Sequence, residues 1–151
     1  MRLTLHTDYG LRLLMYVALQ NGQRCTIREA AEAFAISRNH LMKIANLLQQ
    51  TGYLDAVRGK GGGLTLARPA TSIRLGELVQ TLEPDMALAE CLGSDNQCVV
   101  TPHCLLTGVL TDALQAFLRS LNQYSLDDIC QPRQAPLRRL LRIEIAQAPG
   151  A

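Results

Sequence analysis

The fold of this 151-residue chain is decided by the stretch Thr26-Ile27-Arg28-Glu29-Ala30-Ala31-Glu32-Ala33-Phe34-Ala35-Ile36-Ser37-Arg38-Asn39-His40-Leu41-Met42-Lys43-Ile44-Ala45-Asn46-Leu47-Leu48. Thr26 with Glu29 three residues later is the pattern of a capping box, which predicts that a helix opens at Thr26. After the tight connection Ala35-Ile36-Ser37, apolar residues recur at helical spacing and predict a second helix from about Arg38 to Thr51. Two short helices joined by such a turn form a helix-turn-helix, whose second helix is the candidate reader of the DNA major groove.

Structure is also predicted on both sides of this motif. Upstream, residues 7–20 have the pattern of a helix that Thr7 can cap and Asn21-Gly22 ends. Downstream, two short β-like runs, 53–57 and 64–67, flank a glycine-rich tip, which predicts a β-hairpin wing. A phosphate-binding glycine loop is the competing interpretation, but the order GxxxxGK[ST] is absent and a strand follows instead of a helix.

The second half of the chain is predicted to be helical around one irregular loop. An amphipathic helix over about 104–123 has an apolar face too wide for the small remaining domain to bury, so we expect it to pack on a second subunit. Overall we expect a mainly α fold with a small β wing, divided into a winged helix-turn-helix (1–68), a connecting segment with a helix at Ile73–Leu82 (69–84), a cysteine loop (85–104), a dimerisation helix followed by a capped turn (105–130), and a partly disordered tail with a basic amphipathic stretch at Leu137–Ile145 (131–151).

Charge is distributed unevenly, although the net charge is only +2. Residues 1–68 hold nine Lys and Arg against four Asp and Glu, residues 69–130 hold two against eight, and residues 131–151 hold four against one. This asymmetry favours a nucleic-acid-binding half joined to a separate sensing or assembly half.

Composition restricts the class of protein further. A hydrophobic content of 48% suffices for a globular core, and 19% charged residues exclude a disordered tail protein. The apolar stretches are too short to span a membrane and residues 1–8 lack a signal h-region, so we expect a cytoplasmic protein. No nucleophile–base motif or recognisable pair of acids is present, so we do not expect an enzyme.

Three cysteines in one short stretch, Cys91-x6-Cys98-x5-Cys104, are the candidate metal ligands. Where thiols are kept reduced, clustered cysteines bind metal more often than they form disulfides, although buried thiols acting as small hydrophobes are the alternative. Three thiolates supply one ligand too few for a closed four-coordinate zinc or iron–sulfur site. Besides a bound water or thiol, the fourth ligand could come from His103, Glu90 or Asp95. Two further cysteines stand alone and are interpreted as ordinary thiols, Cys25 and Cys130.

Three motifs resemble the bacterial winged-helix regulators that include IscR, NsrR and RirA. They are Thr7-Asp8-Tyr9-Gly10-Leu11-Arg12, Ile36-Ser37-Arg38-Asn39-His40-Leu41-Met42-Lys43-Ile44 and Val57-Arg58-Gly59-Lys60-Gly61-Gly62-Gly63. The three cysteines lie at the family's location, just before the dimerisation helix, and the resemblance covers roughly residues 1–130. Within this family the chain looks most like the nitric-oxide-sensing NsrR branch, on Ser37–Lys43, Leu82–Pro84, Thr101–Cys104 and Tyr124–Asp128. The position of the histidine ligand of IscR-like members holds Thr107 here, which argues against that branch.

The resemblance implies a site, a cofactor and a signal. It implies a [4Fe-4S] cluster, or alternatively a [2Fe-2S] cluster, on Cys91, Cys98 and Cys104, with Asp8 of the partner subunit as a candidate fourth ligand. It also implies a homodimer that represses genes for nitric oxide detoxification and leaves DNA when nitric oxide dismantles the cluster. The alternatives are an iron or cluster-status regulator of the same fold, and a DNA-binding module with structural zinc.

The expected partner is double-stranded DNA carrying an inverted repeat. Its contacts are predicted on the early turns of the reading helix and at the tip of the wing, where side chains reach the major groove and the phosphates or minor groove. The candidate DNA-binding residues are Arg38, Asn39, His40, Lys43, Arg58 and Lys60.

Overall fold

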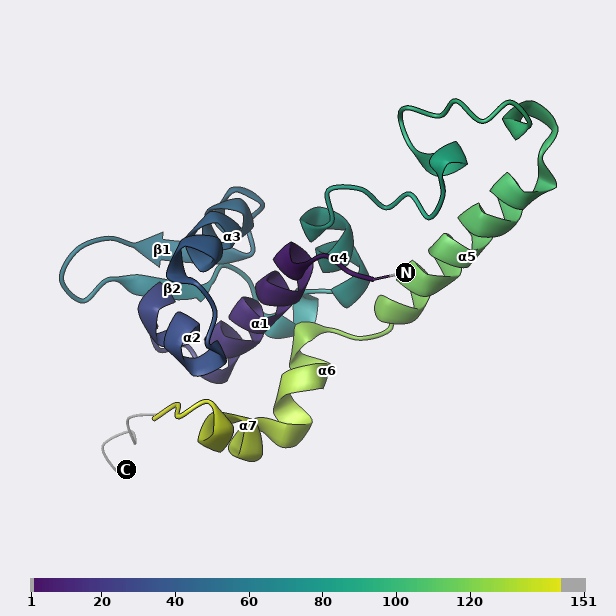
Figure 1. Ribbon diagram of the computed structural model, residues 1–151. Coiled ribbons are helices and arrows are strands. Elements are labelled where there is room, and N and C mark those ends of the chain that lie inside the picture. The colour runs from purple at the N-terminus through teal and green to yellow at the C-terminus, as the bar shows by residue number, and fades with distance from the viewer. Residues whose placement is uncertain (1, 145–151) are drawn as a thin grey trace.

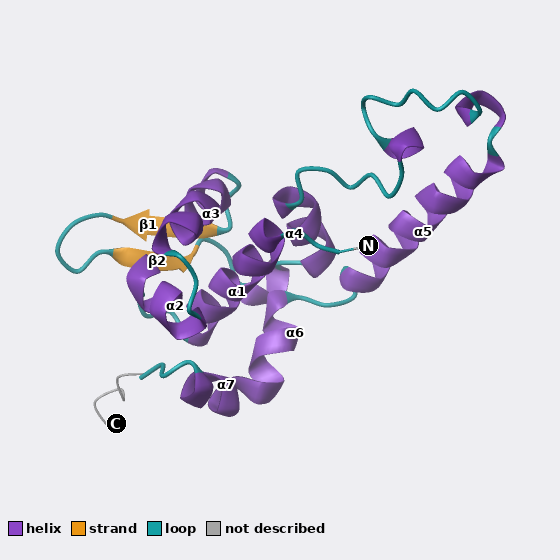
Figure 2. Ribbon diagram, in the orientation of Figure 1, coloured by secondary structure: helices purple, strands orange, loops and turns teal. Residues whose placement is uncertain are grey.

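The computed structural model describes residues 2–144, a mainly helical chain with one two-stranded antiparallel sheet, which confirms the predicted fold class (Figure 1 and Figure 2). The elements follow in the order α1 (Leu5–Leu19), α2 (Ile27–Phe34), α3 (Arg38–Gln50), β1 (Leu54–Val57), β2 (Gly63–Leu66), η1 (Ala70–Ser72), α4 (Leu75–Leu82), η2 (Glu90–Leu92), η3 (Thr101–His103), α5 (Leu105–Leu121), α6 (Leu126–Cys130), η4 (Gln131–Arg133) and α7 (Gln134–Leu140), where η marks a 3₁₀ helix.

Helix α1 is the central helix of the body. It contacts α2, α3, α4, α6, α7 and strand β2, so most of the apolar burial in the molecule is organised around it. Its side chains Leu13, Leu14 and Leu19 are completely buried, as are Leu41 and Leu48 on the facing side of α3. Burying side chains of this size is the main driving force that holds the helices together.

The start of α1 corrects the prediction that Thr7 caps it. The helix begins at Leu5, and Thr4 is the cap, because its side-chain oxygen accepts the N–H of Thr7 at 3.2 Å. Thr4 is itself held by Glu83, which accepts the Thr4 N–H at 2.7 Å from just beyond the end of α4. The local sequence could not indicate this arrangement, because the residue that stabilises the cap lies 79 positions away.

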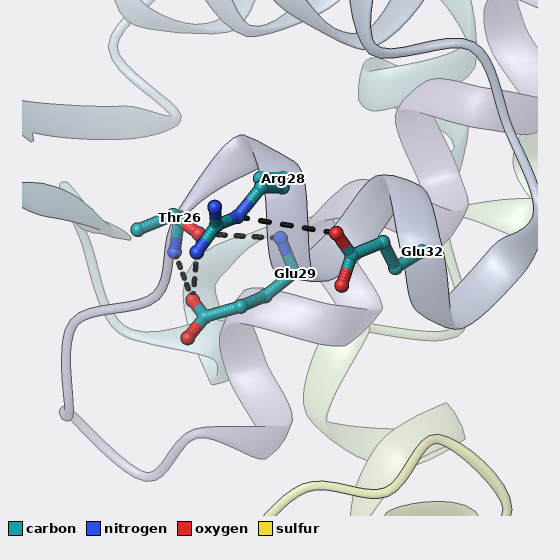
Figure 3. Close-up of polar contacts among 4 residues, drawn as sticks. All are labelled: Thr26, Arg28, Glu29 and Glu32. Carbon is teal, nitrogen blue, oxygen red and sulfur yellow. Dashed lines mark hydrogen bonds and ion pairs between the residues drawn. The ribbon is translucent and has the colours of Figure 1, made fainter.

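The predicted helix-turn-helix is formed by α2 and α3. The capping box is confirmed: the Thr26 hydroxyl accepts the Glu29 N–H at 3.2 Å, while the Glu29 carboxylate accepts the Thr26 N–H at 2.6 Å (Figure 3). The turn to α3 passes through Ala35, a non-glycine residue in the left-handed region with φ of 53°. This turn sets the angle at which α3 leaves α2 and exposes its outer face.

The predicted wing is the hairpin of β1 and β2, paired from Leu54 with Leu66 to Val57 with Gly63. It projects from the body next to α2 and α3 (Figure 1). A short extended segment before α2 also joins the sheet, because Cys25 and Leu64 form an antiparallel bridge. The sequence pattern did not predict this third extended segment of the sheet.

The connecting helix α4 begins at Leu75, two residues later than predicted. Residues 73 and 74 are extended because the Ile73 carbonyl accepts the Leu126 N–H at 2.9 Å and Arg74 bridges to Ser125. Ser125 also caps α6 in a second capping box: its hydroxyl accepts the Asp128 N–H at 3.2 Å, and the Asp128 carboxylate accepts the Ser125 N–H at 2.7 Å. The predicted capped turn is therefore a short helix that packs under α1.

Helix α5 runs away from the body and carries the cysteine loop at its far end (Figure 1). Its second half packs on α4, and there Leu118 is only 4% exposed. Its first half is uncovered, with Leu105 88%, Leu106 57% and Val109 62% exposed. The unpartnered part of the predicted apolar face is therefore the N-terminal half of the helix. No helix within residues 2–144 is long and apolar enough to cross a membrane.

The segment after α6 contains a helix that begins earlier than the predicted amphipathic stretch. Helix α7 spans Gln134–Leu140, earlier than the predicted 137–145, and contacts α1. The Arg138 guanidinium donates from Nε to the Leu19 carbonyl at 2.8 Å, and Leu137, Leu141 and Ile143 pack against the core. The predicted disorder at the chain end concerns residues 149–151, which lie outside the described residues.

Replacing Gly76 with alanine is expected to destabilise the crossing of α4 and α5. A Cβ at this position would lie 2.5 Å from Asn122 Oδ1 and 2.6 Å from the Leu118 carbonyl oxygen, and the Asn122 oxygen already accepts the Glu77 N–H. We expect Gly76→Ala to lower the free energy of unfolding by about 1–3 kcal/mol, measured by urea denaturation. Gly10→Ala is the comparison, because its Cβ would meet only the end of the Leu82 side chain. A larger loss at Gly10 would contradict the prediction.

Candidate functional site

The six predicted DNA-binding residues are all exposed and lie on α3 or on the loop between β1 and β2. Helix α3 buries Leu41, Ile44, Ala45 and Leu48, so its opposite face is free to enter a groove. Asn39 and Lys43 lie on that outward face, because they are about half a turn away from the buried stripe. Both residues are exposed near the start of α3, and their contact with bases stays a prediction.

Arg38 lies on the flank of α3 that faces the wing. With Met42 it lines an open groove of about 410 Å³, whose other walls are the start of α2 and the wing residues Val57 and Gly63. Arg28, in the first turn of α2, lines the same groove, and its Nε is 3.9 Å from a Glu32 oxygen (Figure 3). Arg28 is not among the six residues that the sequence predicts to bind DNA.

His40 lies on the other flank of α3 and contacts α1. Its ring stacks on Tyr9, with ring centroids 6.4 Å apart and an angle of 30° between the planes. His40 therefore lies away from the outward face that Asn39 and Lys43 share. Tyr9, which follows Asp8 in α1, therefore contacts α3 directly.

The three clustered cysteines lie in the loop between α4 and α5. Cys91 is in η2, which contacts α5, Cys98 follows a turn in which its N–H donates to Asn96 Oδ1, and Cys104 immediately precedes α5. All three are free and half-buried. Among residues 2–144 no three His, Cys, Asp or Glu side chains are close enough together to hold a metal ion. The three thiols are therefore close in the sequence but do not converge on one point in space.

The other candidate ligands near the cysteines differ in position and in hydrogen bonding. Glu90 Oε1 accepts the Gln97 N–H at 3.0 Å, which closes the loop around Cys91. His103 is in η3, one residue before Cys104. Thr107 is on α5, and its side-chain oxygen is buried without a hydrogen-bond partner.

Cys25 and Cys130 are chemically different from the clustered cysteines. Both are buried, and burial, with smaller effects of nearby acids, raises the pKa of the Cys25 thiol to about 12 and that of Cys130 to about 11. A raised pKa keeps the thiol protonated at neutral pH, whereas metal ligation needs the thiolate. This supports the interpretation of Cys25 and Cys130 as ordinary buried thiols.

Asp8 is in the first turn of α1, where its carboxylate pairs with Arg12. The Arg12 guanidinium donates from Nε at 3.1 Å and from Nη2 at 2.8 Å, so both carboxylate oxygens are engaged. Both side chains are exposed, and an exposed pair of this kind is worth less than about 1 kcal/mol, so a stronger ligand could displace Arg12. A role for Asp8 in a cluster on a partner subunit remains a proposal.

Comparisons with known proteins identify the family. The family model of Rrf2, described as an iron-dependent transcriptional regulator, matches residues 3–132, and the chain belongs to this family of DNA-binding transcription regulators. This confirms the class predicted from the sequence motifs but not the NsrR branch within it.

Solved structures of the same fold include regulators with different names. IscR of T. potens aligns with a TM-score of 0.70 and 19% identity over 98% of this chain and 94% of that chain. CymR of B. subtilis, described as the global cysteine regulator, aligns with a TM-score of 0.65 and 19% identity over 87% and 98%. The oxidised form of Staphylococcus aureus CymR aligns with a TM-score of 0.67 and 23% identity over 87% and 97%. At these identities the likeness establishes the winged-helix fold and leaves the signal open.

Proposed function

We propose that this protein is a homodimeric repressor that holds an iron–sulfur cluster on Cys91, Cys98 and Cys104 and leaves its operator when nitric oxide attacks the cluster. The observation that carries the proposal is the contrast among the five cysteines. The three in the loop are free and only half-buried, whereas Cys25 and Cys130 are buried with raised pKa values. The family description as iron-dependent supports the same choice of cofactor.

The donor set fits an iron–sulfur cluster. Thiolates are the usual protein ligands of such clusters, and three of them leave one iron for a weaker ligand. Bound there, a [4Fe-4S] cluster would supply an iron site with which a diatomic gas can react. The loop residues must move to bring the three sulfurs together, which is expected because a metal site rarely exists preformed without its metal.

The remaining residues connect the loop to the DNA-binding half. Glu83, just before the loop, accepts the N–H of Thr4 and so ties the start of α1 to the foot of the loop. Four residues later α1 presents Asp8, our proposed ligand to the partner's cluster, and Tyr9 then contacts His40 of α3. Losing the Asp8 ligand would release α1 of one subunit from the loop of the other, and the two α3 helices would lose their fixed separation.

The second candidate function is an iron or cluster-status regulator, which the family description favours. It uses the same fold and the same thiols but a different signal. A zinc-structured DNA-binding module is a third candidate, and a colourless, zinc-loaded protein after anaerobic purification would favour it over both.

The test compares three forms of the protein on one duplex selected by the holo-protein from a random DNA pool. Anaerobic interferometry would measure the affinity of the holo-protein, the cluster-free protein and the holo-protein treated with nitric oxide. We expect tight binding only by the untreated holo-protein. Equal affinity of all three forms would reject gating by the cluster, and tighter binding by the cluster-free form would favour the iron-status regulator.

Replacing Asp8 with alanine is expected to leave a cluster that assembles but is more labile. Three thiolates remain, and a water or an added thiol can fill the fourth position. The measurement is the rate at which a chelator bleaches the visible absorption of the anaerobic protein, compared with wild type. Arg12→Gln is the matched control, because it removes the partner of Asp8 but leaves the carboxylate free to bind iron. Equal bleaching rates for Asp8→Ala and wild type would reject Asp8 as a ligand.

Changes at the DNA interface are expected to separate phosphate contacts from base contacts. Lys60→Ala should weaken binding to all sequences and reduce the slope of log affinity against log salt by about one, because one phosphate contact is lost. Asn39→Ala should instead cost about 1–3 kcal/mol of discrimination between the selected duplex and a mismatched one. Fluorescence anisotropy over a range of salt concentrations measures both, and unchanged binding by both variants would refute the assignment of α3 and the wing.

A further inference from the structure

The wing is attached to the segment that precedes the helix-turn-helix. Cys25 donates its N–H to the Leu64 carbonyl at 3.2 Å and accepts the Leu64 N–H at 2.7 Å, so the backbone at Cys25 pairs with β2 on the side opposite β1. The two backbones are in close contact, since a Cβ on Gly63 would lie 2.8 Å from the Cys25 carbonyl oxygen. The Cys25 side chain is buried, and its Sγ is 3.9 Å from the Leu64 carbonyl oxygen.

One side chain reaches from this segment to the tip of the wing. Arg24 donates from Nη1 to the Gly61 carbonyl at 3.1 Å, a contact between residues 37 positions apart. Gly59 and Gly61 both have positive φ values, 93° and 78°, and the turn is closed by a hydrogen bond from the Gly62 N–H to the Gly59 carbonyl. A glycine-rich tip is flexible and therefore loses much conformational entropy when it binds DNA. The contact of Arg24 with Gly61 restricts the tip beforehand and so reduces this loss.

We propose that Arg24 is a positioning residue for DNA binding, whose guanidinium holds the Gly61 carbonyl and thereby fixes the wing tip relative to the recognition helix. Residue 24 is two positions before Thr26, the cap of α2, so the anchor joins the wing tip to the helix-turn-helix itself. The anchor then holds Arg58 and Lys60 at a set distance from α3. These are the two residues at the tip that we assign to DNA contact. The proposal rests on the wing contact of the proposed function, and it does not depend on the cluster or its signal.

The competing role for Arg24 is a direct phosphate contact, because it is an exposed cation in the basic half of the chain. The two roles differ in what they do to salt dependence and to the free protein. A phosphate contact releases counterions, whereas a residue that acts through the wing tip does not. Only a positioning role predicts that the tip is loosened in the absence of DNA.

The experiment measures Arg24→Gln on the duplex selected by the wild-type holo-protein, with Arg133→Gln on η4 as a control that removes the same charge elsewhere. We expect Arg24→Gln to weaken binding about fivefold without changing the salt slope, as for loss of one hydrogen bond. In an Arg58→Ala, Lys60→Ala background the further effect of Arg24→Gln should fall below about twofold, because residues that act together are not additive. Hydrogen exchange of the free protein should show faster exchange at residues 59–62 in Arg24→Gln only.

Three results would overturn the inference. A salt slope reduced by about one, with affinity restored by Arg24→Lys, would make Arg24 a phosphate contact. Unchanged exchange at the wing tip would mean that the Gly61 contact does not hold it. Unchanged affinity of Arg24→Gln would mean that Arg24 has no role in DNA binding. If the Arg58→Ala, Lys60→Ala protein also binds like wild type, the result instead rejects the proposed contact of the wing with DNA.

Discussion

Cys91→Ala, Cys98→Ala and Cys104→Ala should each abolish the iron–sulfur absorption of the anaerobically purified protein and reduce its operator affinity to the non-specific level. Each change removes one of three thiolates, and two thiolates with one weaker ligand do not hold a cluster stably. Specific binding exceeds non-specific binding by at least about a thousandfold in typical regulators, so we expect a loss of that order. Iron and sulfide content and interferometry on the selected duplex would measure the two effects together.

The matched controls for these variants are the two buried cysteines. Cys25→Ala and Cys130→Ala should retain full iron content, since both thiols are remote from solvent and held protonated by burial. Each should lower the free energy of unfolding by about 1 kcal/mol, because a small buried group is removed. A loop-cysteine variant with wild-type iron content would reject that residue as a ligand, and loss of iron in a control would reject the division of the cysteines.

Leu106→Glu and Val109→Glu should convert the protein from a dimer to a monomer. Both side chains are exposed on the first half of α5, so the change is harmless to a single chain. In a dimer built on this helix the new carboxylate would be buried without a partner, at a penalty of several kcal/mol. Sedimentation velocity at micromolar concentration would detect the dissociation, and affinity for an inverted repeat should fall with it because two linked reading helices become one.

The choice of these positions depends on the structure. From the apolar pattern alone, Leu114 and Leu118 are equally good sites for a disruptive charge, but Leu118 is buried against α4 of its own chain. Gln115→Glu is the control, since Gln115 is exposed and half a turn away from Leu106 on the same helix. A dimeric Leu106→Glu protein, or a monomeric wild type, would refute the proposed interface.

The parts of the fold that were predictable from sequence are those that local residues determine. The capping box of Thr26 and Glu29 lies within one helical turn, so the start of α2 was predicted correctly. The predicted start of α1 was wrong because its cap depends on Glu83, and the predicted bounds of α7 were too late because this helix is held by the contact of Arg138 with Leu19. Contacts between residues far apart in sequence leave no periodic signal.

The candidate site was predictable in its residue types and not in its geometry. The spacing of the loop cysteines made them candidate ligands, and the burial of Cys25 and Cys130 agrees with the interpretation of those two as ordinary thiols. The flank on which His40 lies, facing Tyr9, could not be predicted, because it depends on how α1 packs on α3. Arg24 was overlooked because its contact with Gly61 spans 37 positions and has no motif.

The crossing of α4 and α5 has a mechanical consequence. Helix α5 has 17 residues and therefore measures about 25 Å, with the close contact of Gly76 and Asn122 at one end and the cysteine loop at the other. A rotation of about ten degrees at that crossing displaces the far end by about 4 Å, from the helix length alone. A tilt of α5 at its contact with Gly76 would therefore displace the cysteine loop by nearly the spacing of two neighbouring β-strands.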